Sequence, residues 1–289
     1  MDSVRQADLD QRARWNGLAG RAWVDAREVL DAMFRTFADL LVDSVTVRRE
    51  SVVLDVGCGT GGTTLAVARR LAPPGRCTGI DISEPMIAAA RERAEQAPAP
   101  VDFICADVQD HPFAPGTFDV IFSRFGVMFF DAPVRAFTAL RRIARDGAEL
   151  RFVSWRHPDA NPFMTTAERA AAPYLSHLPT REPDAPGQFA FADRHRVGRI
   201  LAQSGWADVD IRPVDAECVF PERALVDYFT RFGPLGSVFG QLDENDRAAV
   251  VETVRAAFDG FVRDAEVRFT AACWLVVARA PAASDIPEQ

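Results

Sequence analysis

The sequence contains no lysine, so all 33 residues counted as lysine or arginine are arginine. A chain without lysine cannot form a Schiff base with pyridoxal phosphate or with a carbonyl substrate. Its catalysis also cannot use a lysine ammonium group. Lysine-dependent reaction types are therefore excluded.

Cysteine is scarce and long apolar runs are absent. The five cysteines form no C-x-x-C pair, and no histidine stands close enough to complete a zinc pattern; they are Cys58, Cys77, Cys105, Cys218 and Cys273. The longest apolar run, residues 271–278, is too short to span a bilayer, and residues 1–12 lack the apolar core of a signal peptide. We expect buried reduced thiols, no metal, no membrane partner and a cytoplasmic location.

The chain is acidic, with a formal net charge of −8 and an isoelectric point of about 5.1. Its arginines are scattered among aspartates and glutamates, which disfavours a nucleic-acid partner. A length of 289 residues with 48% hydrophobic content suits one elaborated domain with a large core. Amphipathic stripes near both ends could be buried within a monomer or across a homodimer.

One stretch, VVLDVGCGTGG from Val52 to Gly62, organises the rest of the chain. It predicts a buried strand, a tight glycine turn and the start of a helix. Gly57, Gly59 and Gly62 fit G-x-G-x-x-G, so dinucleotides and other nucleosides are both candidate ligands. Asp55 favours the second class, because its carboxylate would repel a pyrophosphate and attract a cation. S-adenosylmethionine (SAM), with a sulfonium, an ammonium and a ribose, is such a ligand.

Alternating strand and helix patterns follow this stretch. Helices are expected over 63–71, 84–96 and 133–144, and further strands over 76–83, 101–107, 118–123 and 148–155. With the first strand they make five parallel strands. Four polar residues stand at strand ends: Asp55, Asp81, Asp107 and Ser123. Because the carboxyl ends of parallel strands meet at one edge of a sheet, we expect these side chains to gather at a ligand site.

The remaining segments are predicted to be mainly helical and to belong to the same single domain. Residues 1–45 should form a helical lid, 46–156 the nucleotide-binding core, and 157–190 and 221–262 helical insertions around a second pocket. A helix over 191–206, a strand from 207 and a last strand from 266 should precede a disordered tail, 280–289. In the lid, Trp15 and Trp23 pack on the domain or close over the ligand, with Gly17 and Gly20 as hinges.

Five ordered motifs closely resemble those of the class I SAM-dependent methyltransferases, in particular the ubiquinone/menaquinone-biosynthesis-like group. They are VLDVGCGTG (53–61), GIDIS (79–83), CADVQDHPF (105–113), FDVIFSRFGVMFF (118–130) and CWLVVAR (273–279). The resemblance also reaches 15–23 and 191–201, and so covers nearly the whole chain. It implies a Rossmann-like α/β fold with seven mostly parallel strands, the last inserted antiparallel, helices on both faces, and helical lid insertions.

The resemblance also implies which residues hold the cofactor, SAM, and its product S-adenosyl-L-homocysteine (SAH). Asp55, Gly57, Gly59 and Gly61 would contact the methionyl part, and Asp81 would hold the ribose. Asp107 would recognise the adenine amino group, and the end of the fourth strand would line the methyl-donor end. The predicted cofactor-binding residues are Asp55, Gly57, Cys58, Gly59, Gly61, Asp81, Ile82, Met86, Asp107, Val108, Ser123 and Trp23.

The methyl acceptor is not implied, because members of the group methylate several kinds of atom on one scaffold. The 21 phenylalanines favour a small hydrophobic or aromatic molecule, of the kind found in specialised metabolism. We predict that acceptor-binding residues include Trp15, Phe125, Met128, Phe129, Trp155, Tyr174 and Phe229. The predicted catalytic residues are His157, Glu168 and Arg124, and Tyr174 and His177 are further candidate bases. Arg124 could pair with an acidic acceptor or with the carboxylate of SAM.

Two other functions stay open at this point. A protein could keep this fold and cofactor but catalyse another reaction, such as a cyclisation, or only bind its ligand. An NAD-dependent oxidoreductase is disfavoured by Asp55, by Asp107 and by the absence of a Tyr-x-x-x-Lys pair.

Overall fold

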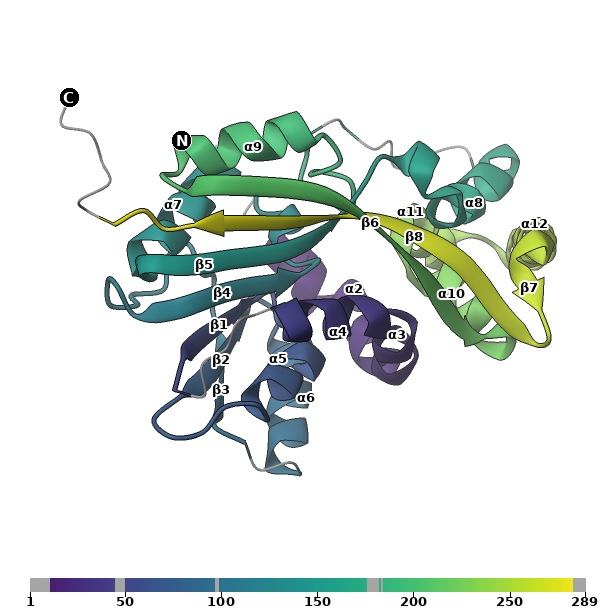
Figure 1. The fold of residues 1–289 in the computed structure, drawn as a ribbon. Coiled ribbons are helices and arrows are strands. Elements are labelled where there is room, and N and C mark those ends of the chain that lie inside the picture. Colours follow the sequence, from purple (N-terminus) through teal and green to yellow (C-terminus); the bar gives the residue numbers. More distant parts are fainter. Residues whose placement is uncertain (1–10, 45–49, 97–98, 176–181, 183, 283–289) are drawn as a thin grey trace.

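A central sheet organises the computed structural model, which describes residues 11–44, 50–96, 99–175, 182 and 184–282. The strand order is β3-β2-β1-β4-β5-β8-β6, with β7 paired to β8 (Figure 1). The strands are β1 (Val52–Val56), β2 (Arg76–Asp81), β3 (Val101–Cys105), β4 (Phe118–Arg124), β5 (Ala144–Trp155), β6 (Ala207–Pro221), β7 (Val262–Arg263) and β8 (Glu266–Arg279). The first five are parallel, and β8 runs antiparallel between β5 and β6. The predicted Rossmann-like α/β fold, with its inserted antiparallel strand, is confirmed.

Helices cover both faces of this sheet. One face carries α4 (Arg35–Ser44), α5 (Gly62–Ala68) and α6 (Glu84–Glu95), and the other carries α7 (Pro133–Ile143) and α9 (Arg194–Gln203) (Figure 1). Strands covered on both faces need apolar residues at successive positions, and β1 is accordingly buried along its whole length. Phe137 of α7 packs on Phe152 of β5 with ring centroids 5.6 Å apart. The core therefore fills both sides of the sheet and leaves its carboxyl edge for ligands.

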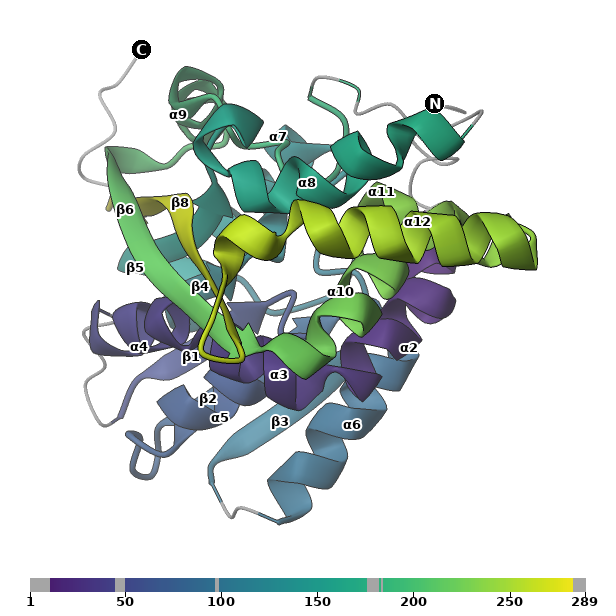
Figure 2. The same ribbon diagram turned by 90° about the vertical axis from the view of Figure 1, so that its right-hand side faces the viewer.

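A helical cap stands beside that edge. It combines α2 (Leu18–Asp25) and α3 (Arg27–Met33) with α8 (Pro162–Ala171), α10 (Leu225–Arg231), α11 (Gly233–Val238) and α12 (Glu244–Ala257). β6 and β8 run on beyond the sheet as a two-stranded ribbon, and α8 and α10–α12 pack around its far end (Figures 1 and 2). Phe163 of α8 stacks on Phe269 of β8 with centroids 3.9 Å apart. The predicted helical insertions are thus anchored on the last strand.

Short 3-10 turns complete the described elements: η1 (Val127–Phe129), η2 (Pro158–Ala160), η3 (Ala172–Tyr174), η4 (Glu222–Ala224), η5 (Phe239–Gln241) and η6 (Asp259–Phe261). Among the described residues, no helix is long and apolar enough to cross a membrane.

The N-terminal part of the cap is tied to the start of α6. The Ser83 hydroxyl donates a hydrogen bond to the Trp15 carbonyl at 2.7 Å, and the Asn16 side chain accepts one from the Glu84 N–H at 2.8 Å. Ser83 is the N-cap residue of α6, but its own side chain makes no capping hydrogen bond, and the Asn16 side chain accepts from the first turn instead. Gly17 separates two helical stretches as a hinge would, whereas Gly20 lies inside α2, where a Cβ would come 3.0 Å from the Ser83 hydroxyl.

Several element boundaries differ from the predicted ones. α5 ends at Ala68 instead of residue 71, and β5 begins at Ala144, which pairs with Phe118 across an irregularity. α9 begins at Arg194, because the Asp193 side chain accepts a hydrogen bond from the His195 N–H and caps the helix. Of the predicted tail, 283–289 lie outside the described residues, but Ala280 is buried and donates a hydrogen bond to the Ala148 carbonyl.

Candidate functional site

The polar strand ends gather at one edge of the sheet, as predicted. Asp81 and Asp107 line a cavity of about 1080 Å³ between this edge and the helical cap. Asp55 lines a small chamber of about 50 Å³, which adjoins the cavity because Gly57, Gly59 and other residues line both. We call these two spaces the main cavity and the small chamber.

Two glycines, Gly57 and Gly126, bring the loops after β1 and β4 together beside the main cavity. Gly57 has a φ of +67°, and a Cβ there would lie 2.7 Å from the Cα of Gly126. A Cβ on Gly126 would lie 2.6 Å from the Val56 carbonyl oxygen. The loops after β1 and β4 therefore touch backbone to backbone, which only glycine at both positions permits. Gly126 was not recognised from the sequence, because its partner comes from another loop.

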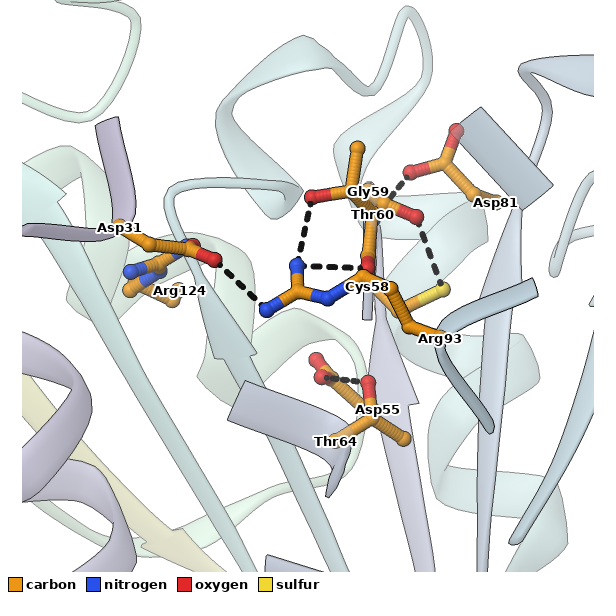
Figure 3. Close-up of polar contacts among 9 residues, drawn as sticks. All are labelled: Asp31, Asp55, Cys58, Gly59, Thr60, Thr64, Asp81, Arg93 and Arg124. Carbon is orange, nitrogen blue, oxygen red and sulfur yellow. Dashed lines mark hydrogen bonds and ion pairs between the residues drawn. The ribbon is translucent and has the colours of Figure 1, made fainter. Parts of the chain in front are cut away.

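Asp81 is held in place by two backbone donors. Its carboxylate accepts hydrogen bonds from the Gly59 N–H at 2.8 Å and the Ser83 N–H at 2.9 Å (Figure 3 shows the first). Burial raises the pKa of Asp81, and the hydrogen bonds from Ser83 and Gly59 oppose that shift. A carboxylate has about four acceptor positions, so positions remain for ligand hydroxyls. Asp81 thus links the glycine turn to a position where ligand hydroxyls could be bound, as a ribose site requires.

Asp107 organises the next part of the main cavity. Its carboxylate accepts hydrogen bonds from the Gln109 N–H at 2.8 Å, and the Gln109 side chain also donates to Asp131 at 3.2 Å. The apolar residues Ile82, Met86 and Val108 line the same cavity. A carboxylate flanked by apolar side chains can hold the amino group of a flat heterocycle such as adenine.

Asp55 lies deep beneath the turn. It is 1% exposed, and its carboxylate accepts a hydrogen bond from the Thr64 hydroxyl at 2.7 Å (Figure 3). Burial raises the pKa of Asp55 to about 7, although the Thr64 hydrogen bond and the Arg124 charge act in the opposite direction. Near neutral pH, Asp55 is therefore about half protonated without a ligand. A cation nearby would favour its charged form, so cation binding and loss of this proton are coupled.

We expect the affinity for SAM to increase with pH between about 5.5 and 7.5, where the amine of SAM stays charged. Below the Asp55 pKa of about 7 a cation must displace a proton, so affinity should fall by up to about tenfold per pH unit. Calorimetric dissociation constants at several pH values would measure the slope, and Asp55→Asn should remove it. A wild-type affinity that is constant with pH would contradict this coupling.

Cys58 also lines the small chamber, but it does not act as an ionised ligand. It is 9% exposed, and burial raises the pKa of its thiol well above the usual value. The thiol therefore stays protonated and serves as a small packing group.

Aromatic side chains form the walls of the main cavity beyond the strand ends. Phe125, which has an unusual φ of +63°, stacks on Trp155 with centroids 4.9 Å apart and planes 13° apart. Trp15 meets Phe129 edge-on at 4.9 Å, and Trp23 meets Phe232 at 5.9 Å. Trp15 therefore contacts the loop after β4 and Trp23 contacts another part of the cap, and both line the main cavity.

Most of the residues predicted for the site line one of these two spaces. Those that line the main cavity are Trp15, Trp23, Gly57, Gly59, Asp81, Ile82, Met86, Asp107, Val108, Arg124, Phe125, Met128, Phe129, Trp155, His157, Glu168 and Phe229. Asp55 and Cys58 line the small chamber. The further base candidate His177 lies outside the described residues.

Three predicted site residues do not line either space. Gly61 faces the core, where a Cβ would meet the Phe103 ring at 2.7 Å. The fully buried Ser123 hydroxyl donates to the Val56 carbonyl and accepts from the Gly126 N–H, so it fixes the loop instead of contacting a ligand. Tyr174 is 41% exposed on η3, and its hydroxyl pairs with Thr253 of α12 at 3.0 Å. Gly61, Ser123 and Tyr174 therefore do not form part of the walls of the main cavity or of the small chamber.

An ion-pair cluster at the small chamber was also missed. Asp31 of α3 lies 2.9 Å from an Arg93 guanidinium nitrogen and 3.3 Å from one of Arg124 (Figure 3). The three residues come from the lid, α6 and β4, and no local sequence pattern connects them. Only the amphipathic spacing of the lid helices could have pointed to Asp31 as a polar residue on a packed helix.

The residues of the site fit SAM. Gly57 and Gly59 line both spaces, so a ligand can lie against their backbone, and Asp81 offers fixed acceptors to hydroxyl groups. Thr63 lines the small chamber at 3% exposure, and its hydroxyl contacts no hydrogen-bond partner within the described residues. A buried hydroxyl without a partner is unfavourable, which indicates that a polar ligand group completes it.

The chain is similar to known methyltransferases over most of its length. Residues 53–147 match the family model described as a methyltransferase domain. The nocamycin O-methyltransferase of Saccharothrix syringae is 39% identical over 235 residues, 75% of this chain and 81% of that protein. The demethylmenaquinone methyltransferase of Renibacterium salmoninarum is 26% identical over 235 residues, covering 77% and 96%. The solved YcgJ protein of Bacillus subtilis shares the fold, with a TM-score of 0.58, 16% identity and coverage of 86% and 99%.

The similarity in sequence and the geometry of the site agree on the cofactor. The matched residues contain the glycine turn, Asp55, Asp81 and Asp107, which line the main cavity or the small chamber. This chain belongs to the class I SAM-dependent methyltransferases, in the group that resembles the ubiquinone and menaquinone methyltransferases.

Proposed function

We propose that the protein transfers the methyl group of SAM to a bulky organic metabolite, mainly apolar and aromatic, that binds under the helical cap. One observation carries this proposal: a single cavity joins the cofactor residues Gly57, Gly59 and Asp81 to an aromatic roof. Its volume of about 1080 Å³ slightly exceeds the usual range for one ligand, about 300–1,000 Å³. The space therefore suits a cofactor and an acceptor side by side.

The roof is aromatic and comes mostly from the cap. Its aromatic residues include Phe125, Phe129, Trp155, Phe163, Tyr228, Phe229, Phe232 and Phe258. Such side chains offer flat faces to a ring system and exclude water from the reacting atoms. An acceptor with fused or conjugated rings would match this lining better than a small charged metabolite.

SAM, when bound, supplies a methyl group on a positively charged sulfur that an acceptor atom can attack in line. The chain's own residues then have to hold, orient and desolvate the acceptor. The Phe125–Trp155 stack stands at the ends of β4 and β5, directly beside Arg124. This rigid wall would align an aromatic acceptor against the cofactor side of the cavity.

The names of two relatives support this class of reaction. One is named for demethylmenaquinone and the other for O-methylation of nocamycin, so both act on small organic molecules and the second on oxygen. Methylation of a hydroxyl oxygen requires loss of its proton. His157 and Glu168 both line the main cavity and are the candidate bases, and the His157 Nδ1 lies 3.2 Å from a carboxylate oxygen of Asp159.

At least one of His157→Gln and Glu168→Gln should slow methylation of a hydroxyl acceptor. Loss of a general base lowers kcat by about 10²- to 10⁴-fold, while the Kd for SAH should stay within about twofold of the wild-type value. His195→Gln, which changes an exposed residue of α9, provides the matched control. If both site variants keep the wild-type kcat on a hydroxyl acceptor, the base assignment is wrong.

The acceptor class can be tested with methyl-labelled SAM and a panel of phenols, quinols, indoles and prenyl compounds. We expect label in products from the large aromatic phenols and quinols, and none from small charged amines. Preferential methylation of small polar acceptors would contradict the proposal.

A further inference from the structure

The cluster formed by Asp31, Arg93 and Arg124 lies near the end of β4, whereas Asp107 follows β3, at the other end of the strand order β3-β2-β1-β4. Asp31 belongs to α3 of the lid, so it is the lid's acidic contact with the sheet edge. Its contact with Arg124, at 3.3 Å, is longer than its contact with Arg93, at 2.9 Å. The side chains are only 26%, 30% and 15% exposed for Asp31, Arg93 and Arg124. Partly buried charges of this kind interact more strongly than surface pairs.

The small chamber places these charges around a polar space. Asp31, Arg124, Arg27 and Asp55 line it, together with the buried Thr63 hydroxyl that no described residue contacts. Arg93 does not line the chamber. It donates a hydrogen bond to the Thr60 carbonyl and pairs with the other carboxylate oxygen of Asp31. Asp31 would therefore keep its position if its contact with Arg124 were replaced.

The amino-acid end of SAM carries an ammonium and a carboxylate next to each other. The chamber offers an acid and an arginine in contact at 3.3 Å, and both line a space that shares Gly57 and Gly59 with the main cavity. A ligand whose ribose lies at Asp81 and whose chain crosses these glycines ends in this chamber. Opposite charges on both partners make the zwitterion a better match than either a simple cation or a simple anion.

We propose that the amino-acid end of SAM replaces the direct Asp31–Arg124 ion pair. Asp31 accepts hydrogen bonds from the ligand's ammonium group, Arg124 donates to its carboxylate, and the Thr63 hydroxyl gains a partner. Asp31 is then a cofactor-binding residue supplied by the lid, and cofactor binding fixes α3 over the site. The inference rests on SAM as the cofactor and does not depend on the identity of the acceptor.

Binding of two ligands that differ only at this end tests the proposal. SAH carries the amino-acid end, whereas 5′-methylthioadenosine has the same adenosine and thioether without it. We expect Asp31→Asn and Arg124→Gln each to weaken SAH binding by about 10- to 100-fold and methylthioadenosine binding by less than about twofold, measured by calorimetry. Thermal unfolding of each variant would confirm that it is folded.

Arg93→Gln is the matched control, because it removes the other Asp31 partner without removing a residue that lines the chamber. It should change the affinities for both ligands by the same small factor. Equal weakening of both ligands in Asp31→Asn would show that Asp31 only holds the lid, and would overturn the proposal. Tighter SAH binding in that variant would also overturn it, since Asp31 would then compete with the ligand's carboxylate. A failed acceptor panel would leave both outcomes unaffected.

Discussion

Asp81→Ala should lose most of the affinity for SAM and SAH. The carboxylate offers acceptors to the ligand, and it also positions the Gly59 and Ser83 N–H groups at 2.8 and 2.9 Å. Hydrogen bonds that involve a charged group contribute about 1.5–3 kcal/mol, so the Kd should rise by roughly 10- to 150-fold. Because the glycine turn loses its anchor as well, we expect the upper part of this range.

Calorimetry with SAH measures this effect, and two further variants serve as comparisons. Asp81→Asn keeps one acceptor oxygen and most of the shape, so its Kd should lie between those of the wild type and Asp81→Ala. Asp110→Ala changes an exposed acid that pairs with Arg135 and does not line the main cavity, and its Kd should be unchanged. If Asp81→Ala bound SAH as tightly as the wild type, the ribose assignment would be wrong.

Gly126→Ala should destabilise the fold and damage the cofactor site together. The added Cβ would lie 2.6 Å from the Val56 carbonyl oxygen and 2.8 Å from the Gly57 Cα, and backbone atoms cannot rotate away as a flexible side chain would. Overpacking usually costs about 1–3 kcal/mol, and we expect a loss of about 3 kcal/mol in the free energy of unfolding. Because Gly57 must shift, SAH affinity should fall by at least about tenfold.

Chemical denaturation and SAH calorimetry measure the two effects of this substitution. Gly198→Ala is the control, because Gly198 lies inside α9 and a Cβ there would meet no atom within 4 Å. That variant should be about 0.5–1 kcal/mol more stable than the wild type, since alanine favours the helix. A Gly126→Ala protein with wild-type stability and affinity would show that the two loops do not need backbone contact.

Much of the fold followed from local patterns in the sequence. Apolar runs that end in Asp55, Asp81, Asp107 and Ser123 predicted parallel strands with a shared polar edge, because strand direction alone brings their ends together. The antiparallel placement of β8 came from the family resemblance, since residue periodicity carries no information on strand order. Boundaries moved where a tertiary contact decided them, as at the bulge between β4 and β5.

The site was predicted less completely, and the errors share a physical cause. Asp31 and Gly126 act through partners that are far away in the sequence, so no spacing rule identifies them. Ser123 was placed at the correct strand end, but its hydroxyl is used by the adjacent loop. Tyr174 follows a helix that does line the cavity, and the 3-10 turn directs it to Thr253 instead. Strand ends are predictable from sequence, whereas the direction of a single side chain depends on packing.

The most direct test of the cofactor site is calorimetric titration of the wild-type protein and Asp81→Ala with SAH and, separately, with NAD. We predict that SAH binds the wild type with one site per chain, that Asp81→Ala binds it at least tenfold more weakly, and that NAD binds neither protein. Tight binding of NAD without binding of SAH would contradict the account.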